Sequence, residues 1–446
     1  MFKITIPENC NPYEILELAK VFLKPEELKI EFGLEDPNWN PHKREALKQD
    51  VYNQLSEYTK ISPKWGILTG VRPVKLVGNL VREIGFENTR KKLSDFYYIH
   101  SEKINLLLDI YNYQQEHLKE NHKDTALYIG IPFCPTRCSY CSFTSNQGSR
   151  DEMIEYVDAL EHEIISVAKL MEKSNKLTET IYVGGGTPTA LPADQLERLM
   201  KIIDKSFSRD NLKEFTVEAG RPDTISQDKL SVLKNYGVDR ISINPQSMNE
   251  KTLERIGRSH SPEAVLKAFE MARPFDFQIN SDVIAGLPGE IPEDFQKTLT
   301  TMIKEGSDNI TVHTLAVKRA STLLLEDKDY HYSAKDNVEA MLKKAHELLP
   351  EAGYHPYYLY RQKHMAGALE NVGYCKEGTM CEYNVRIMEE HQSLIALGAG
   401  GISKAYYPQE DRLERIPNVS NYKIYIERID EMIERKMKNL FMEEAL

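Results

Sequence analysis

The stretch IPFCPTRCSYCSF, residues 131–143, holds three cysteines, Cys134, Cys138 and Cys141, in the spacing Cys-x3-Cys-x2-Cys. An iron–sulfur cluster that only carries electrons commonly takes four thiolate ligands. Three thiolates this close together can hold three irons of a [4Fe–4S] cluster and leave the fourth iron open. Because an open iron can bind a further molecule, the spacing indicates an enzyme and not a simple electron carrier.

A zinc site is the main alternative for these thiols. Structural zinc takes four tetrahedral ligands, usually Cys or His, and the fifteen residues after Cys141, SFTSNQGSRDEMIEY, contain neither. A disulfide would leave one of the three thiols unpaired, and six cysteines in 446 residues do not indicate a disulfide scaffold. An iron–sulfur cluster is therefore favoured, with zinc as the second interpretation.

Composition sets the class of protein around this motif. A chain of 446 residues is long enough for two or three domains and a large core. The net charge of −11 argues against a nucleic-acid-binding surface. The first twenty residues lack the apolar run of a signal peptide, and no apolar stretch approaches the ~20 residues of a membrane span. We therefore expect a cytoplasmic protein that does not cross a membrane.

Short apolar runs alternate with longer amphipathic ones from the cysteine motif to about residue 317. The strand candidates are ALYIGIP (126–132), TIYVGGGT (180–187), EFTVEAG (214–220), RISINPQ (240–246), FQINSDVIAGLP (277–288) and NITVHTLAV (309–317). The helical patterns between them include residues 153–171, 193–207 and 262–273. This alternation predicts parallel βαβ units, and six units are too few for a closed eight-fold barrel. The predicted fold class is α/β, with an open, partial (β/α)6 barrel.

The regions on either side of the barrel have different patterns. We predict an N-terminal α+β accessory domain over residues 1–120, the barrel over 121–335, and a mainly helical region that covers the substrate over 336–446. The last of these contains the glycine-rich segment ALGAGGIS (396–403) and an amphipathic pattern over 421–441. The sequence assigns no chemistry to the N-terminal domain.

Polar residues lie at the ends of the strand candidates, where parallel α/β folds bind ligands. One belongs to each of the first five candidates: Cys134, Thr187, Glu218, Gln246 and Asp282. The glycines of GGGTPT (184–189) would let backbone amides approach a ligand closely, although a tight turn is the plain alternative. Glu218 lies in an apolar run and needs a partner, which would be a ligand ribose or ammonium group or a buried salt bridge.

The cysteine spacing, with Tyr140 before the last cysteine, resembles that of the radical SAM superfamily, in which the open iron binds the amino and carboxylate groups of S-adenosylmethionine (SAM). The flanking LYIGIPFC and CSF resemble the oxygen-independent coproporphyrinogen III oxidase family. WGILTGVRP (65–73) and the tail CEYN…ALGAGGISK (381–404) are similar to the HemZ branch of that family. The resemblance extends over nearly the whole chain from about residue 60, and it implies the partial barrel, a [4Fe–4S] cluster and SAM.

The resemblance also implies which residues bind these cofactors. The cluster ligands would be Cys134, Cys138 and Cys141. The residues that would contact SAM are Tyr128, Tyr140, Gly185, Gly186, Thr187, Glu218, Gln246, Arg258 and Asp282. Without the resemblance, Tyr128 would be interpreted as a core aromatic residue and Arg258 as a solvated helix residue.

The implied reaction belongs to haem biosynthesis. A low-potential donor such as flavodoxin or ferredoxin reduces the cluster, and SAM is then cleaved. The resulting 5′-deoxyadenosyl radical takes hydrogen from a propionate of coproporphyrinogen III. That propionate loses carbon dioxide and leaves a vinyl group. A substrate with four carboxylates calls for cations at the barrel mouth. The candidates are Arg221, Lys318, Arg319 and Arg361, each with solvent exposure as the plain alternative.

This sequence departs from the prototype oxidases at two positions. Phe143 stands where they carry a further cysteine, and Gly130 stands where they usually carry a histidine. Relatives without decarboxylase activity deliver haem as chaperones or degrade it as methyltransferases, and these remain alternative functions. CEYN (381–384) replaces the Cys-x-His-Asn motif of the chaperone branch.

A haem-binding function would need an axial ligand. The candidates are His313, His355, His364 and His391. Cys375 and Cys381 could in principle bind a second metal, but we interpret them as plain thiols.

Overall fold

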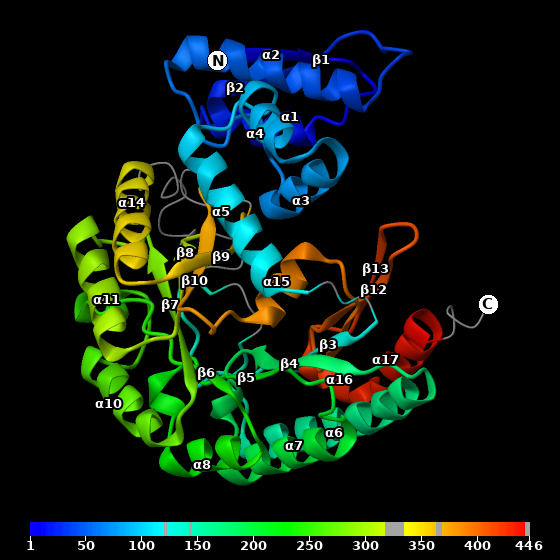
Figure 1. The fold of residues 1–446 in the computed structure, drawn as a ribbon, viewed down its shortest axis with the longest axis vertical. Coiled ribbons are helices and arrows are strands. Elements are labelled where there is room, and N and C mark those ends of the chain that lie inside the picture. Colours follow the sequence, from blue (N-terminus) through cyan, green and yellow to red (C-terminus); the bar gives the residue numbers. More distant parts are fainter. Residues whose placement is uncertain (120, 122, 142–144, 317–333, 363–367, 442–446) are drawn as a thin grey trace.

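The computed structural model describes residues 1–119, 121, 123–141, 145–316, 334–362 and 368–441 (Figure 1). Four residues of the sequence predictions, Phe143, Lys318, Arg319 and His364, lie outside the described residues.

The described strands of the barrel lie in one curved sheet in chain order. They are β3 (Thr125–Ile131), β4 (Thr178–Gly185), β5 (Glu214–Glu218), β6 (Arg240–Ser242), β7 (Gln278–Ala285) and β8 (Asn309–Thr314). Each pairs in parallel with the next. Most of their residues are buried on both faces, as parallel strands covered by helices require. All six overlap the predicted runs, although β3 and β4 begin one and two residues earlier, and the partial (β/α)6 barrel is confirmed.

Helices cover the outer face of the sheet (Figure 1). They are α6 (Arg150–Lys173), α7 (Ala193–Ser206), α8 (Gln227–Asn235), α10 (Pro262–Ala272), α11 (Pro292–Glu305) and α14 (Lys335–Glu351), with the short α9 (Glu250–Arg255) between β6 and α10. In α7, Leu196, Leu199, Met200 and Ile203 are buried at the spacing of one helix face. The side chain of Ser149 caps α6 in a capping box with Glu152.

The C-terminal region extends the sheet at both ends. Its strands are β9 (His355–Tyr360), β10 (Asn371–Cys375), β11 (Leu394–Leu397), β12 (Ile402–Tyr407) and β13 (Arg412–Pro417). The sheet order among the described residues is β13-β12-β11-β3-β4-β5-β6-β7-β8-β10-β9, with β11 parallel to β3 and β10 antiparallel to β8. The prediction of a mainly helical region missed these strands, because they are short and do not alternate apolar with polar residues.

The helices of this region are α15 (Glu382–Glu389), α16 (Tyr422–Glu427) and α17 (Ile429–Lys436), followed by a π-helical turn (Met437–Phe441). In Figure 1, α15 lies inside the curve of the sheet. The Arg386 guanidinium on α15 binds the buried Glu179 at the start of β4 at 2.9 Å. Arg240, at the start of β6, binds Glu214 at 2.6 Å and donates to the carbonyl of Thr379 at 2.8 Å. The segment leading into α15 therefore covers the N-terminal ends of the barrel strands.

The N-terminal region has two parts. A parallel pair, β1 (Phe2–Ile6) and β2 (Leu28–Phe32), packs with α1 (Tyr13–Ala19) and α2 (Pro41–Thr59) around a small core of its own. By contrast, α3 (Pro73–Ile84), α4 (Phe86–Asp95) and α5 (Ser101–His117) share the core of the barrel, and α5 packs against β9. Among the described helices, none combines the length and apolar character needed to span a bilayer.

Candidate active site

A cavity of about 430 Å³ lies where the barrel strands end. It is lined by all three motif cysteines, by all nine residues predicted to contact SAM, and by Arg221. Arg361 is not among the lining residues. Residues spread over more than 150 positions of sequence therefore meet at one place, as expected for strand ends in a parallel fold.

The cysteine loop is tied to its surroundings by backbone hydrogen bonds. The Cys134 amide donates to the carbonyl of Asn146 at 2.9 Å, and the Ser139 amide donates to the carbonyl of Ile256 at 3.0 Å. The Cys134 Sγ lies 3.5 Å from the Thr187 hydroxyl. These contacts hold the loop between the end of β3 and the segment after α9.

The donor set suits an iron–sulfur cluster. Three cysteine side chains, from Cys134, Cys138 and Cys141, line one cavity, and none of them forms a disulfide. Within the described ranges, no three His, Cys, Asp or Glu side chains are grouped to hold a single metal ion. A cluster does not need such a group, because its thiolates bind separate irons. The residues present therefore fit a cluster with three thiolate ligands.

The glycine segment after β4 keeps the strand close to the cysteine loop. The Gly186 and Thr187 amides donate to the carbonyls of Ile131 and Phe133, both at 2.7 Å, so these two amides bond within the chain and not to a ligand. A Cβ on Gly186 would lie 2.5 Å from the Phe133 carbonyl oxygen and 3.0 Å from the Cys134 Sγ. Any side chain there would push the loop away from β4, which is why glycine is needed.

Two arginines belong to the described part of the cavity lining, and both are already bonded to the protein. Arg258 donates to the carbonyl of Asn244 at 2.8 Å and to the Tyr140 hydroxyl at 3.4 Å, while its buried Nε has no partner among the described residues. Arg221 pairs with Asp223 at 2.8 Å and reaches to 3.9 Å from the Cys138 Sγ. Arg221 therefore lies against the cysteine loop, whereas the sequence suggested it as a substrate contact.

Arg361 occupies a different place. Its guanidinium donates to the carbonyls of Leu68 and Ala368 at 2.5 and 2.7 Å and lies 4.8 Å from the centre of the Trp65 ring. It therefore joins the WGILTGVRP segment to β9 and does not face the cavity.

Glu218 lies beside a stack of tyrosines. The Tyr182 hydroxyl donates to Glu218 Oε1 at 2.6 Å, and the Tyr182 ring stacks on Tyr383 of α15 at 4.4 Å and on Tyr128 at 6.4 Å. Burial, together with the charge of Asp282, raises the pKa of Glu218 to about 7. This carboxyl group therefore changes protonation in the neutral range while no ligand is bound.

Asp282 is the centre of a polar network. Its carboxylate accepts from the side-chain amides of Asn244 and Asn280 at 2.8 and 2.9 Å, and His313 Nε2 lies 3.6 Å away. Burial opposes its charge, but His313 and the neighbouring amide still hold the pKa of Asp282 below its usual range. Gln246 reaches the same strand through its backbone, in the left-handed region at φ 62°. Such a conformation is strained for a residue other than glycine.

The sequence prediction missed several residues of the lining. They are Tyr182, Asn244, Asn280, Tyr358, Tyr360 and Tyr383. Tyr182 lies in a predicted strand, so its position could have raised it as a candidate. His313, which the sequence suggested only as a haem ligand, also lines the cavity. Tyr358, Tyr360 and Tyr383 come from elements that were not predicted.

The remaining sequence candidates lie elsewhere. His355 lines a second hollow described below, and His391 packs against Tyr406. The Cys375 thiol donates to the Tyr113 hydroxyl at 3.5 Å and the Cys381 thiol to Glu214 at 3.1 Å, which agrees with plain thiols.

Comparisons with known proteins agree with this site. The family model "Radical SAM superfamily" matches residues 128–302. The oxygen-independent coproporphyrinogen-III oxidase-like protein HemZ of Bacillus subtilis is 39% identical over 412 residues, 89% of this chain and 82% of that protein. The heme chaperone HemW of the same organism is 32% identical over 61% of this chain and 69% of that protein. The solved structure of coproporphyrinogen III oxidase (HemN) from Escherichia coli has the same fold, with a TM-score of 0.56 and 23% identity over 72% of each chain.

The fold and the cysteine cavity define a radical SAM protein, whose cofactors are a [4Fe–4S] cluster and SAM. Within that superfamily, the chain belongs to the oxygen-independent coproporphyrinogen III oxidase family and to its HemZ-like branch.

Proposed function

We propose that this protein is a radical SAM oxidoreductase that converts propionate side chains of coproporphyrinogen III to vinyl groups. The observation that carries the proposal is the single cavity lined by three thiols and nine residues at the positions the family uses for SAM. The 39% identity to a protein named as coproporphyrinogen-III oxidase-like supports the choice of substrate.

We assign roles to the side chains on the same basis. Cys134, Cys138 and Cys141 hold the cluster, and the nine residues from Tyr128 to Asp282 named above hold SAM. The bound cluster and SAM together supply a carbon-centred radical that abstracts hydrogen. The protein orients the reactants and excludes water and oxygen from the enclosed barrel. Glu218, kept in place by the Tyr182 hydroxyl, offers an acceptor for a ligand hydroxyl or ammonium group.

We further propose that residues 336–446 cover the substrate and that residues 1–120 form an accessory domain. Tyr358, Tyr360 and Tyr383 add an aromatic wall to the cavity, which suits the pyrrole rings of a tetrapyrrole. The electron that cleaves SAM would come from a low-potential donor of the flavodoxin or ferredoxin kind. The substrate radical, on losing carbon dioxide, would in turn pass one electron to an acceptor.

Anaerobic product analysis tests the proposal. Reconstituted, reduced protein is incubated with SAM and coproporphyrinogen III, and the expected products are 5′-deoxyadenosine and protoporphyrinogen. A Cys138→Ser variant should form neither. Formation of 5′-deoxyadenosine without any vinyl product would overturn the proposed reaction and leave the radical SAM chemistry intact.

Haem delivery is the second candidate, favoured by the 32% identity to a heme chaperone and by His313 in the cavity lining. Tyr383, however, stands at the histidine position of the chaperone motif and is stacked on Tyr182. Titration with haem decides the matter: a Soret shift at micromolar haem supports delivery. Consumption of haem with SAM turnover would instead indicate ring opening with methyl transfer.

A further inference from the structure

A chain of three hydrogen-bonding side chains lies in the cavity wall formed by β7, β8 and β9. Asp282 is on β7, His313 is on β8, and Tyr360 is the last residue of β9. His313 Nε2 lies 3.6 Å from Asp282 Oδ1, and His313 Nδ1 lies 3.1 Å from the Tyr360 hydroxyl. All three residues line the cavity that holds the cysteines.

The cations of this wall bear on how an anionic substrate could bind. In the part of the lining that the structure describes, the guanidinium groups are those of Arg221 and Arg258, and no lysine is present. Both guanidinium groups bond to Asp223 or to backbone carbonyls. His313 is the further lining side chain there that can carry a positive charge, and its side chain is 27% exposed.

We propose that Tyr360, oriented by His313 and Asp282, binds a carboxylate of the substrate and selects for carboxylate-bearing tetrapyrroles. This inference rests on the proposed function, since it names how the same cavity recognises its substrate. Tyr360 contacts the substrate, whereas His313 and Asp282 are positioning residues that act through it. Gln362, which also lines the cavity, hydrogen-bonds the same hydroxyl and lies beside the proposed carboxylate site.

The proton on His313 decides the direction of the Tyr360 hydroxyl. When the imidazole is protonated, Nε2–H donates to Asp282 and Nδ1–H donates to the Tyr360 oxygen, so the Tyr360 O–H is directed to a cavity anion. When the imidazole is neutral, the Asp282 carboxylate keeps the proton on Nε2, and Tyr360 donates to Nδ1 instead. The hydroxyl then presents its lone pairs to the cavity, and a carboxylate is repelled. Binding of a carboxylate should therefore depend on the proton at Nδ1 of His313.

Asp282, His313 and Tyr360, here called the relay, have other ionisable groups around them. Asp282 from β7 and Tyr360 from β9 face His313 directly. Glu218 from β5, Tyr182 from β4 and Tyr358 from β9 interact electrostatically with Asp282. Burial raises the pKa of all three tyrosines, so they stay neutral below about pH 10. Ionisation of Glu218 near pH 7 adds negative charge to the cavity, so carboxylate binding should weaken as the pH rises through 7 even in a variant that lacks His313.

A binding experiment with a matched control tests the relay. Coproporphyrin III, the stable oxidised form of the proposed substrate, is titrated anaerobically into the reconstituted holoenzyme with SAM, and porphyrin fluorescence gives the affinity. Tyr360→Phe should weaken binding about ten-fold or more, the effect of losing a hydrogen bond to a charged group. Tyr374→Phe is the control, because its hydroxyl also hydrogen-bonds a histidine, His346, but Tyr374 does not line the cavity. The control should keep the wild-type affinity.

Two further readouts separate recognition from a structural role. The tetramethyl ester of coproporphyrin III carries no carboxylate, so it should bind the wild-type protein and Tyr360→Phe with equal affinity. His313→Asn retains a hydrogen-bonding group near the position of Nδ1 but cannot carry a positive charge. It should therefore weaken binding of coproporphyrin III and leave binding of the ester unchanged. Iron content and 5′-deoxyadenosine formation check that each variant is folded and loaded.

Equal affinity of Tyr360→Phe and the wild-type protein for coproporphyrin III would overturn the relay, and so would an unchanged preference for the acid over the ester. These outcomes are distinct from failure of the proposed function. If the wild-type protein shows the Tyr360-dependent preference but releases no vinyl product, the oxidase proposal fails and carboxylate recognition stands. If vinyl product forms equally with Tyr360→Phe, the relay alone fails.

Discussion

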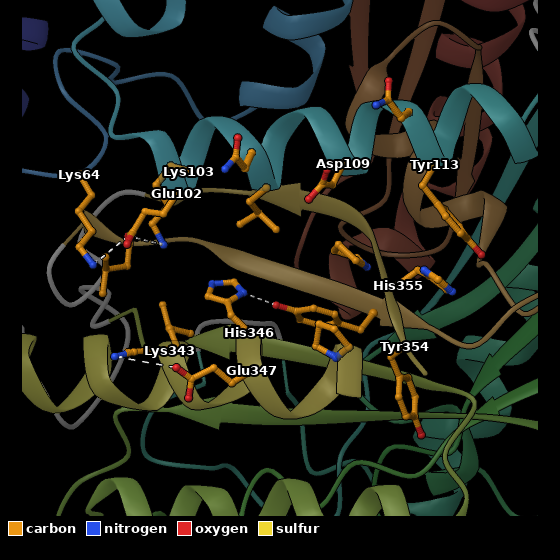
Figure 2. A pocket seen from close by; sticks show the side chains of 18 of the residues that line it. Lys64, Glu102, Lys103, Asp109, Tyr113, Lys343, His346, Glu347, Tyr354 and His355 are labelled. Atoms are coloured by element: carbon orange, nitrogen blue, oxygen red, sulfur yellow. Dashed lines mark hydrogen bonds and ion pairs between the residues drawn. The ribbon is translucent and has the colours of Figure 1, made fainter. Parts of the chain in front are cut away.

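The barrel cavity and a groove between α5 and α14 are two hollows of different character. The groove is the larger, about 650 Å³ against about 430 Å³. Figure 2 shows charged side chains from both helices along it, including Glu102 and Asp109 from α5 and Lys343 and Glu347 from α14. Lys343 and Glu347 are 77% and 59% exposed, and they pair with each other at 3.9 Å. In the cavity, by contrast, polar groups lie at the ends of buried strands.

The difference shows that the volume of a hollow does not indicate where the chemistry of this protein takes place. Side chains on an exposed helix face can exchange protein partners for water at little cost. Side chains at buried strand ends cannot, so each needs a defined partner from the chain or from a ligand. The floor of the groove is an exception, because Lys103 binds the fully buried Glu370 at 2.5 Å there. Leu369 lines the groove and Asn371 lines the barrel cavity, so the short segment around Glu370 borders both hollows.

The largest expected effect is in the cavity. Replacing Cys134, Cys138 or Cys141 with serine should abolish the cluster and all 5′-deoxyadenosine formation, because each thiolate holds one iron. Iron and acid-labile sulfide content, together with product analysis, check this. Cys375→Ser is the matched control, since its buried thiol donates to Tyr113 and lies outside the cavity lining. A full cluster in any of the three motif variants would contradict the assignment.

The next effect concerns the floor of the groove. Lys103→Met leaves the buried Glu370 without its closest cation, and breaking such a pair costs about 3–5 kcal/mol of folding free energy. Glu370 also accepts from Trp65 Nε1 at 2.9 Å, so the α5 side of the groove should loosen with it. Urea unfolding of the apoprotein measures the loss. A change below about 1 kcal/mol would mean that His346, 3.3 Å from Glu370, compensates for the lost lysine.

A smaller effect is expected from Glu218. Its pKa rises from 4.5 to about 7 on folding, so the folded protein keeps a proton that the unfolded chain releases. Stability contributed by this group is therefore lost as the pH rises from about 4.5 to 7. Glu218→Gln should stabilise the apoprotein by about 1–3 kcal/mol at pH 8 and have little effect at pH 4.

Glu290 provides a control for that prediction. Burial also raises its pKa to about 7, and it does not line the cavity. Glu290→Gln should show the same pH-dependent stabilisation but leave SAM binding unchanged, whereas Glu218→Gln should weaken it. Equal SAM affinity in the two variants would remove Glu218 from the proposed site.

The smallest effect is expected at the rim of the groove. Lys343→Met removes one partner of an exposed ion pair and should change the free energy of unfolding by less than about 0.5 kcal/mol. Measured beside Lys103→Met, it tests the contrast between the rim and the floor of one hollow. A loss as large as that of Lys103→Met would show that the exposed charges are more strongly coupled than their solvent contact suggests.

The sequence predicted the barrel and the residues at its strand ends because both follow from local patterns. Apolar residues dominate β3, β4 and the middle of β5, and the polar residue that ends or follows each run, Cys134, Thr187 or Glu218, must face a ligand or a partner. The contacts of Arg221 and Arg361 could not be predicted, because tertiary packing sets them. Arg221 binds Asp223 and Ser259, and Arg361 donates to the Leu68 carbonyl. The tyrosines of β9 and α15 were missed for the same reason, since those elements enter the barrel from a distant part of the chain.

The pairing of β11 with β3 has a consequence for the nascent chain. Leu394 lies opposite Ala126, so more than half of the chain must be synthesised between the two strands. At a synthesis rate of about 5–20 residues per second, this leaves the outer edge of β3, next to the cysteine loop, unpaired for tens of seconds. An open apolar strand edge is prone to pair with other chains. Ribosome-associated chaperones would therefore matter most for this protein before residue 394 has emerged.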